Sequence, residues 1–439
     1  MLKRRIAAAL FVPLTGAALA QSPPPPGEPP RATLNPSSAP SASSTAQDPL
    51  SLDAALAMAG ERNPALRSAR SDADASAGAL MQAGARPNPT LSFLQEGFAA
   101  QERTTTGQLS HTLELGGKRR ARLDVASYGR EAALASLDER AATLRADVVR
   151  AFYGLLAAQR QLKVAQQSTA IAARSADMAD KRARAGKVSP VEATKARVAE
   201  SGARIELANA AAQVATAAEQ LANVTGNPAV AGRAAAGDLD AIPEAATLAQ
   251  LRQRLDDAPQ SRTARADMLR ANAQISLEKA RRIPDLTVTA GMKHVVAGGS
   301  PDNQAVVGVS IPLPLFDTNR GAILEATHKA EAARASFDSE RARIELDLSQ
   351  AFTRYQRAAD EARQLKSDVL PAARQSLDAM ARGYELGKFA LLDVIDAQRT
   401  LYQAESRYVQ VLADTHQAYA DIGRLVGEPL GPGPAAPLR

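Results

Sequence analysis

Apolar residues recur at every seventh position along two very long stretches of the chain. In the second stretch the apolar series is Ile323, Ala330, Phe337, Ile344, Ala351, Ala358, Leu365, Ala372 and Ala379. The equivalent series from Leu123 to Ala179 is apolar except at Arg130. A heptad pattern sustained over such a length predicts a coiled-coil helix, and its small alanines allow neighbouring helices to approach closely. We therefore expect two helices of about 68 residues, each about 100 Å long, with Pro371 either kinking the second helix or accommodated in an exposed stretch.

Four short segments alternate imperfectly between apolar and polar residues, as strands do. They are residues 89–98, 105–115, 284–296 and 305–315, and each is close to the roughly 9–11 residues of a membrane β-strand. The pattern leaves two interpretations open: water-exposed hairpins that cap a soluble rod, or strands that enter a membrane. Four strands are too few to close a membrane barrel, whose smallest members have about eight, so a membrane role requires an oligomer.

The chain also contains an internal repeat with a period of about 200 residues. Landmarks return in the same order: Pro64 and Pro89 as Pro259 and Pro284, Gly186-Lys187 as Gly387-Lys388, and the turn GNP (226–228) as GEP (427–429). So many landmarks in one order predict two structurally equivalent halves, which we place at residues 51–230 and 244–430.

Both halves have the same expected layout. A helical pattern of about 30 residues precedes a hairpin, a very long helix, a glycine turn and a closing helix of roughly 37 residues. The hairpins lie at about residues 89–115 and 284–315, and the glycine turns at about 184–190 and 385–391. The expected fold class is therefore mainly α, built from a duplicated helix–β-hairpin–helix unit.

The N-terminal region has the features of an export signal. Residues 1–20 combine the basic Lys3-Arg4-Arg5, an apolar run and Ala18-Leu19-Ala20, which suits a cleaved secretory signal peptide. Residues 21–50 are rich in Pro, Ser and Ala, so we expect a disordered linker, and residues 431–439 form a C-terminal tail. The chain has no cysteine, which excludes disulfides and a thiol-linked lipid anchor.

Charge and motifs exclude several functional classes. The formal net charge is +6, but basic and acidic residues alternate without an aromatic-lined basic stripe, so nucleic-acid binding is not expected. No nucleophile elbow, zinc-protease motif or phosphate-binding loop is present, so we expect neither an enzyme nor a cofactor. The four histidines (His111, His294, His328 and His416) lack the spacing of metal ligands, and we expect no metal site.

One stretch near the C-terminus, YELGKFALLDVIDAQRTL (384–401), carries the most specific signal. Asp393 and Asp396 follow its glycine turn and fall on one face of the next helix. Two interpretations are open: acids that favour the helix dipole, or acids with a role in function. The equivalent positions in the first half are Glu192 and Lys195, so only one acid is retained there.

These features resemble the TolC-like outer-membrane efflux proteins (outer membrane factors) over nearly all of residues 50–430. The resemblance is carried by the duplicated layout, by YELGKFALLDVIDAQRTL and by the GNP and GEP turns. The segment LELGGKRRAR (113–122) looks most like the heavy-metal branch of the family, which serves cobalt–zinc–cadmium and copper–silver efflux systems.

The resemblance implies a homotrimer located in the cell outer membrane and extending into the periplasm. Four strands per chain would form one twelve-stranded transmembrane β-barrel, and the helices an α-helical periplasmic barrel. It implies an exit duct in a tripartite efflux system, joined by a periplasmic adaptor to an inner-membrane pump of the resistance-nodulation-division type. Heavy-metal cations are the expected cargo; organic toxicants, secreted polypeptides, or a non-conducting periplasmic scaffold are the alternatives.

The resemblance also implies roles for residues near the two glycine turns. The adaptor would dock at Gly186, Lys187, Val188, Gly387, Lys388 and Phe389. Asp393 and Asp396 would form acidic rings at the periplasmic gate, where six carboxylates of a trimer attract cations. Glu192 would belong to the same gate, or pair with Lys388 of a neighbouring subunit. Outer-membrane lipid would surround the strands, and Lys118-Arg119-Arg120 would meet its head groups or stay solvated.

Overall fold

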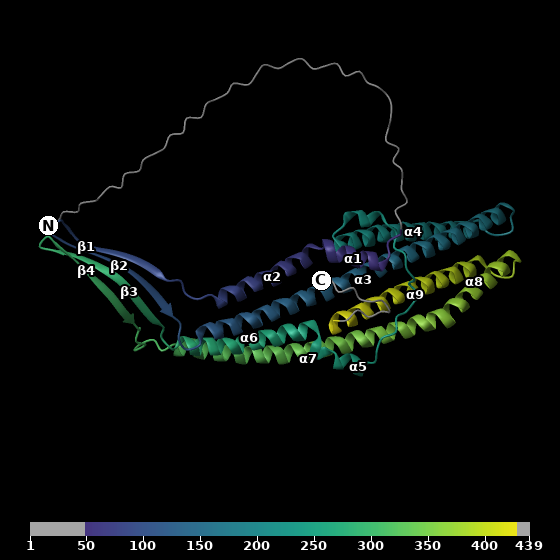
Figure 1. Ribbon diagram of the computed structural model, residues 1–439. Coiled ribbons are helices and arrows are strands. Elements are labelled where there is room, and N and C mark those ends of the chain that lie inside the picture. Colours follow the sequence, from purple (N-terminus) through teal and green to yellow (C-terminus); the bar gives the residue numbers. More distant parts are fainter. Residues whose placement is uncertain (1–48, 428–439) are drawn as a thin grey trace, which may run out of the picture. The chain divides into compact units, whose positions relative to one another are not determined.

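The computed structural model describes residues 49–427 (Figure 1). The expected signal peptide (1–20), nearly all of the expected linker (21–50) and the expected tail (431–439) lie outside these residues. At the linker's end the prediction was wrong, because Leu50 is fully buried and forms a parallel bridge with Ala235.

The described chain repeats one order of main elements, in which two helical segments precede a β-hairpin, a long helical stretch and a closing helix. The first half comprises α1 (Leu52–Arg62), α2 (Pro64–Gly84), β1 (Thr90–Ala99), β2 (Glu102–Leu113), α3 (Lys118–Arg184), α4 (Pro190–Thr225) and the short η1 (Pro228–Gly232). The second comprises α5 (Leu248–Gln253), η2 (Leu255–Asp257), α6 (Pro259–Arg281), β3 (Leu286–Ala297), β4 (Ser300–Ser310), α7 (Arg320–Gln364), the π-helical η3 (Leu365–Val369), α8 (Leu370–Glu385) and α9 (Leu391–Val426). This order confirms a mainly α fold with a duplicated helix–hairpin–helix unit.

Prolines divide the helical pattern that precedes each hairpin. Pro64 begins α2 and Pro259 begins α6, because proline suits the first helical turn but interrupts a helix interior. Asn63 accepts hydrogen bonds from the backbone N–H groups of Ala65 and Leu66 and so starts α2. The uninterrupted pattern of about 30 residues is therefore two helices in the first half, with a matching break in the second.

The repeated glycine turns pack onto these repeated prolines and their neighbours. Gly226 has φ +65°, and a Cβ atom there would lie 2.9 Å from the carbonyl oxygen of Arg62. Gly427 has φ +70°, and a Cβ atom there would lie 2.4 Å from Cδ of Pro259. Both positions need a left-handed backbone and a close approach that only glycine permits. The GNP and GEP landmarks of the sequence therefore close their own repeats.

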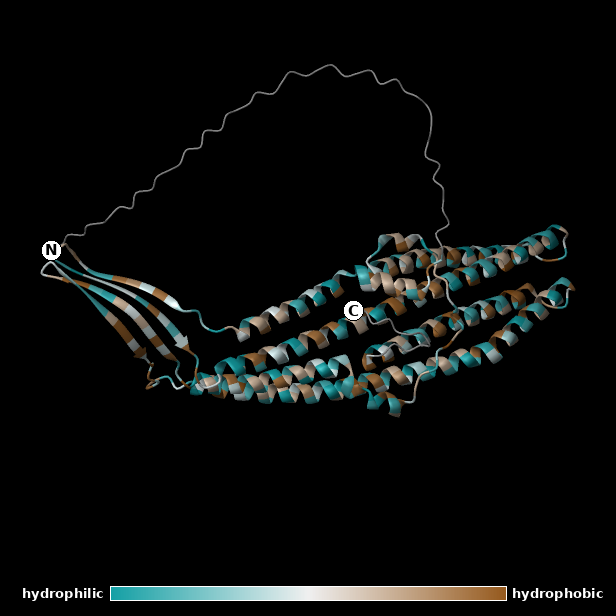
Figure 2. Cartoon of the chain, viewed as in Figure 1, coloured by the Kyte–Doolittle hydropathy of each residue, from teal (hydrophilic) through white to brown (hydrophobic). Residues whose placement is uncertain are grey.

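The four strands form one antiparallel sheet in the order β1-β2-β3-β4, which leaves β1 and β4 as its edges. Its register pairs Thr90 with Ser110, Thr112 with Thr287, and Thr287 with Ser310. Apolar and polar residues both lie along the strands (Figure 2). We expected the last strand at 305–315, but it ends at Ser310, because Pro312 and Pro314 cannot donate to a strand ladder.

The helices pack around α3. In the layer nearer the sheet, adjacent helices pack side by side in the order α2, α3, α6, α7. In the layer nearer the glycine turns, the order is α4, α3, α9, α8. Figure 1 shows both glycine turns at the end of the helices farthest from the strands. Among residues 49–427, none of the helices combines the length and the apolar character required to cross a membrane.

The second long helix changes its buried face at η3. Before η3 the buried residues include Ile344, Ala351 and Ala358, as the heptad predicts. Beyond it, Ala373 and Leu377 are buried, whereas the expected Ala372 and Ala379 are exposed. A π-turn holds one extra residue, so every later side chain is advanced by one position. The predicted apolar series is therefore wrong beyond Leu365.

Pro371 explains where this extra residue lies. Its ring cannot fit against the carbonyl group four residues earlier, at Ser367, in a regular helix. Ser367 lies within η3, where the wider turn makes room for the ring. Pro371 is thus accommodated by a π-turn that ends two residues before it, at Val369.

A connecting segment between the repeats is held by three aromatic side chains. The Tyr408 hydroxyl donates to Oδ1 of Asp240 at 2.5 Å, and the Tyr355 hydroxyl donates to the carbonyl of Pro243. Buried His416 bonds through Nε2 to the carbonyl of Leu239 at 3.0 Å, and its ring stacks on Tyr153 at 3.7 Å. Burial lowers the pKa of His416, so the neutral ring donates this bond.

Candidate docking and gate site

The two glycine turns have the same backbone construction. In the first, Gly186 has φ +67°, and the N–H of Lys187 donates to the carbonyl of Arg182 at 2.9 Å. In the second, Gly387 has φ +74°, and the N–H of Lys388 donates to the carbonyl of Gly383 at 2.8 Å. This six-residue closure with a left-handed glycine satisfies the last carbonyls of α3 and α8. We call residues 182–192 and 383–396 together the tip.

A short apolar core holds together the two helical hairpins of the tip, which are formed by α3 with α4 and by α8 with α9. It consists of residues from α3, α4, α8 and α9, namely Ala176, Ala179, Ala196, Leu377, Tyr384, Leu391, Val394 and Ala397. Half of these side chains are alanine, which lets the four helices approach closely. Burial of this face leaves the turns themselves in solvent, where Gly186, Lys187, Gly387 and Lys388 are exposed.

Arg182 ties the first turn to the second. Its Nη1 donates to the carbonyl of Tyr384 at 2.6 Å, and its guanidinium carbon lies 4.6 Å from the centre of the Tyr384 ring. Tyr384 is 2% exposed, and its hydroxyl has no hydrogen-bond partner among the described residues. Burial raises the pKa of that hydroxyl, and nearby Arg182 opposes the rise. A cation over a buried aromatic ring adds to the hydrogen bond.

The residues after the two Gly-Lys pairs differ in their exposure. Val188 is half-buried, whereas Phe389 is 44% exposed. The Phe389 ring lies directly against α8, because a Cβ atom at Gly383 would come within 2.0 Å of it. Because Gly383 has no side chain, the Phe389 ring can pack against the backbone of α8 at this position. The two turns therefore have different exposed surfaces.

The two aspartates share an exposed face but have different contacts. Oδ2 of Asp393 accepts a hydrogen bond of 2.9 Å from the N–H of Ala390, which caps the start of α9. Asp396 is exposed one turn later, and no side-chain partner for its carboxylate occurs within residues 49–427. The helix-start interpretation thus has direct support at Asp393, and the gate role of both residues stays a prediction.

Glu192 lies on the other hairpin, in the first turn of α4, and is half-buried. Within residues 49–427, neither a hydrogen bond nor an ion pair joins it to Asp393, Asp396 or Lys388. The sequence did not predict a role for Arg182, Tyr384 or Gly383. Their only signal was position: each lies three or four residues before a turn glycine, where a helix end faces its neighbour.

A family model described as outer membrane efflux protein matches residues 55–227 and again residues 251–428, once for each half. The chain belongs to the outer membrane efflux protein family. This confirms the family, the efflux role and the outer-membrane location expected from the sequence.

Three relatives of this outer membrane efflux protein carry metals in their names. One is the cobalt-zinc-cadmium resistance protein CzcC of Cupriavidus metallidurans, 40% identical over 87% of this chain and 91% of the relative. The nickel-cobalt-cadmium resistance protein NccC of Alcaligenes xylosoxydans xylosoxydans is 28% identical over 59% of this chain and 60% of the relative.

Solved structures share the fold of this outer membrane efflux protein. A structure of CusC, described with conformational changes that accompany folding and transmembrane channel formation, has a TM-score of 0.75 at 17% identity and covers 86% of this chain and 92% of its own. The outer membrane protein VceC of Vibrio cholerae has a TM-score of 0.73 at 18% identity and covers 87% and 97%.

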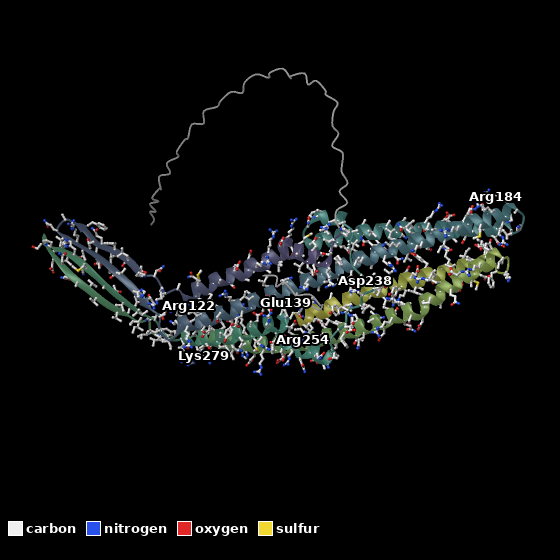
Figure 3. The ribbon with its side chains drawn as sticks, turned by 45° about the vertical axis from the view of Figure 1, so that its right-hand side comes forward. Arg122, Glu139, Arg184, Asp238, Arg254 and Lys279 are labelled. Atoms are coloured by element: carbon white, nitrogen blue, oxygen red, sulfur yellow. The ribbon has the colours of Figure 1, made fainter. Side chains whose placement is uncertain are left out.

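The motif 113–122 of this efflux protein forms a clamp inside the chain. Lys118 pairs with Asp285 at 2.6 Å, Arg122 pairs with Glu114, and Arg119 donates to the carbonyl of Gly84 at 2.6 Å. The Arg122 hydrogen bond lowers the pKa of Glu114. Figure 3 labels Arg122 beside the strands and Arg184 at the other end of α3. These bonds join β2, β3 and α2 to the start of α3, so Lys118 and Arg119 are engaged within the chain.

Metal ligands do not gather in the described part of this efflux protein. No group of three or more His, Asp or Glu side chains there is placed to hold a metal ion.

Proposed function

We propose that three copies of this chain form the exit duct of a tripartite efflux system for heavy-metal cations, with a periplasmic adaptor and an inner-membrane pump of the resistance-nodulation-division type. The metal cargo is supported by the 40% identity to a cobalt-zinc-cadmium resistance protein across 91% of that relative. The duct has no catalytic step, and the pump selects and drives the cargo.

The observation that carries the duct is a pair of matching open edges. The sheet ends at β1 on one side and β4 on the other. In the helical layer nearer the sheet the outermost helices are α2 and α7, and in the layer nearer the glycine turns they are α4 and α8. In each of these three layers one edge belongs to the first half and the other to the second half. Copies placed edge to edge therefore close every layer at once, and three copies give a cylinder of twelve strands.

The strands would enter the membrane with their exposed apolar side chains. Leu91, Phe93 and Phe98 on β1, and Val307 and Val309 on β4, are all exposed in the single chain. Burying such side chains in lipid or between subunits is favourable by about 25 cal/mol per Å². A water-exposed hairpin gains nothing from them, which supports membrane strands over the soluble-rod alternative.

The tip would serve as entrance and docking surface. Asp393 and Asp396 lie on one exposed face at the start of α9, so a trimer would place six carboxylates around its axis and concentrate cations there. The adaptor would contact the exposed turns at Gly186-Lys187 and Gly387-Lys388, with Val188 and Phe389 beside them.

A complementation experiment tests the function. Bacteria that retain the pump and adaptor but lack this duct should regain tolerance to zinc, cobalt or cadmium salts when the chain is restored. Membranes washed with carbonate should retain the protein until detergent is added. Release by carbonate would indicate a periplasmic scaffold, and restored tolerance to organic toxicants alone would overturn the metal cargo.

A further inference from the structure

The connection from β4 to α7 carries large apolar side chains that the rest of the described chain leaves uncovered. We call residues 311–316 the junction loop. Four of its side chains are apolar and are 48%, 75%, 74% and 100% exposed, namely Ile311, Leu313, Leu315 and Phe316. Pro312 and Pro314 alternate with them and restrict the backbone. A continuous exposed apolar segment of this kind marks an interaction site.

The first repeat has no such loop at the equivalent place. Its connection from β2 to α3 contains Glu114, which pairs with Arg122. The N–H of the next residue, Leu115, donates to Oδ1 of Asp285 at 3.1 Å. That connection is therefore held by polar bonds within the chain. The fold does not require an exposed apolar connection here, so the junction loop is a feature of the second half alone.

The junction loop lies at a level where apolar and basic side chains are arranged in succession. Leu113, Leu115 and Ile283 are also exposed where the strands meet the helices. On the helix side of this level, Arg282 directly follows α6 and Arg320 begins α7. Both arginines are exposed, and neither guanidinium has a partner within residues 49–427. Apolar groups bordered by arginines suit a bilayer surface, where acyl chains give way to phosphates.

We infer that the junction loop inserts into the periplasmic leaflet of the outer membrane, and that Arg282 and Arg320 bind the phosphate groups of anionic phospholipids there. The inference rests on the membrane strands of the proposed function, which place the loop at the helix-side surface of the bilayer. The two prolines reduce the conformational freedom that the loop loses on insertion. The loop would thus fix how deeply the sheet lies in the bilayer.

A second copy is a poorer occupant for the loop. In the proposed trimer the end of β4 lies beside the segment that precedes β1 in the next copy. That segment, residues 85–89, reads ARPNP and offers no large apolar side chain. Leu313 and Phe316 would bury little apolar surface there, whereas acyl chains would cover them.

Tryptophan fluorescence of the full chain in phospholipid vesicles tests the insertion, because the chain has no tryptophan of its own. Phe316→Trp and Leu315→Trp each place one reporter in the loop, so the test does not depend on a single variant. Both reporters should be quenched by phospholipids with brominated acyl chains and shielded from acrylamide in the water. The matched control is Leu346→Trp, an exposed position inside α7, which acrylamide should quench instead.

A second pair of variants tests the phosphate contact. In the Phe316→Trp chain, exchanging phosphatidylcholine for phosphatidylglycerol should increase the quenching by brominated lipid. Adding Arg282→Gln and Arg320→Gln should abolish that increase, whereas the control substitution Arg334→Gln, at an exposed arginine inside α7, should retain it. An increase of the same size in both chains would overturn the role of the two arginines.

Met292→Trp separates failure of this inference from failure of the proposed function. Met292 is exposed on the inner strand β3, so brominated lipid should quench this reporter if the strands cross the membrane. Quenching at residue 292, with loop reporters that acrylamide reaches, overturns the insertion and leaves the membrane strands standing. Loop reporters shielded from both quenchers show that a second copy covers the loop, which also overturns the insertion. Lipid quenching at neither place overturns the membrane strands and the insertion with them.

Discussion

Arg182 at the end of α3 donates a hydrogen bond of 2.6 Å to the carbonyl of Tyr384 at the end of α8, and its guanidinium covers the ring of the same tyrosine. One side chain of the first repeat therefore holds the second repeat's turn in place. Separation of the two helical hairpins at the tip would therefore break this contact.

Replacing Arg182 by Ala should loosen the tip. The charged hydrogen bond and the cation–π contact together are worth about 1–3 kcal/mol, so hydrogen exchange of residues 182–192 and 383–396 should accelerate. The matched control is Arg184→Ala, which removes an exposed ion pair with Asp180 worth about 0–1 kcal/mol. Equal exchange in both variants would show that Arg182 does not tie the hairpins.

Replacing Gly387 by Val should abolish metal tolerance while export and trimer formation persist. The left-handed φ of +74° costs a non-glycine residue roughly 1–2 kcal/mol and would reshape the docking turn. Gly78→Val is the control for added bulk, because Gly78 lies inside α2 with open space around its Cβ position. Full tolerance in cells with Gly387→Val would remove this turn from the docking surface.

Substitutions of Asp393 and Asp396 should distinguish a role in capping α9 from a role in ion selectivity. Asp393→Asn keeps an oxygen that can cap Ala390 N–H, so together with Asp396→Asn it removes charge alone. In planar bilayers this double variant should lose cation selectivity and block by trivalent cations. Asp393→Ala should also lower stability by about 0.5–1.5 kcal/mol, because the hydrogen bond from the Ala390 N–H to the carboxylate is lost. Unchanged selectivity in the Asn variant would leave only the capping role.

His416 should make stability depend on pH below neutrality. Burial lowers its folded pKa, so on acidification the unfolded chain takes up the proton first. Stability is then complete above the unfolded pKa of about 6.5 and declines as pH falls below it. His416→Phe should keep the stack on Tyr153 and remove this decline, measured as the thermal midpoint from pH 8 to pH 5.

The control for His416 is His328→Phe, because His328 is exposed and, within residues 49–427, pairs only with neighbouring Glu331. This variant should retain the wild-type pH dependence. At neutral pH His416→Phe should itself cost about 1–3 kcal/mol, since the carbonyl of Leu239 loses its donor. A pH profile identical to that of the wild type would assign the acid sensitivity to other groups.

Much of the fold follows from local pattern. The heptad series and the glycine at each helix end predicted a helix of about 68 residues, and α3 runs from Lys118 to Arg184, because periodicity and turn chemistry act within a few residues. The repeat showed that the second half would use the same elements. Strand ends do not follow from local pattern in the same way, because the pairing of β4 with β3 decides that β4 ends at Ser310, before Pro312.

Only the tertiary structure determined which faces of these helices are buried and which side chains from distant elements come into contact. Pro371 was visible in the sequence, but whether it kinks the helix or is absorbed by a π-turn depends on which buried face the surrounding helices can accept. That choice moved Ala372 and Ala379 outward and Ala373 inward. Likewise Arg182 and Tyr384, or Lys118 and Asp285, lie far apart in the chain, and only packing brings such charges together. Sequence periodicity determines which residues share a helix face, whereas the partner that each face meets is a property of the folded chain.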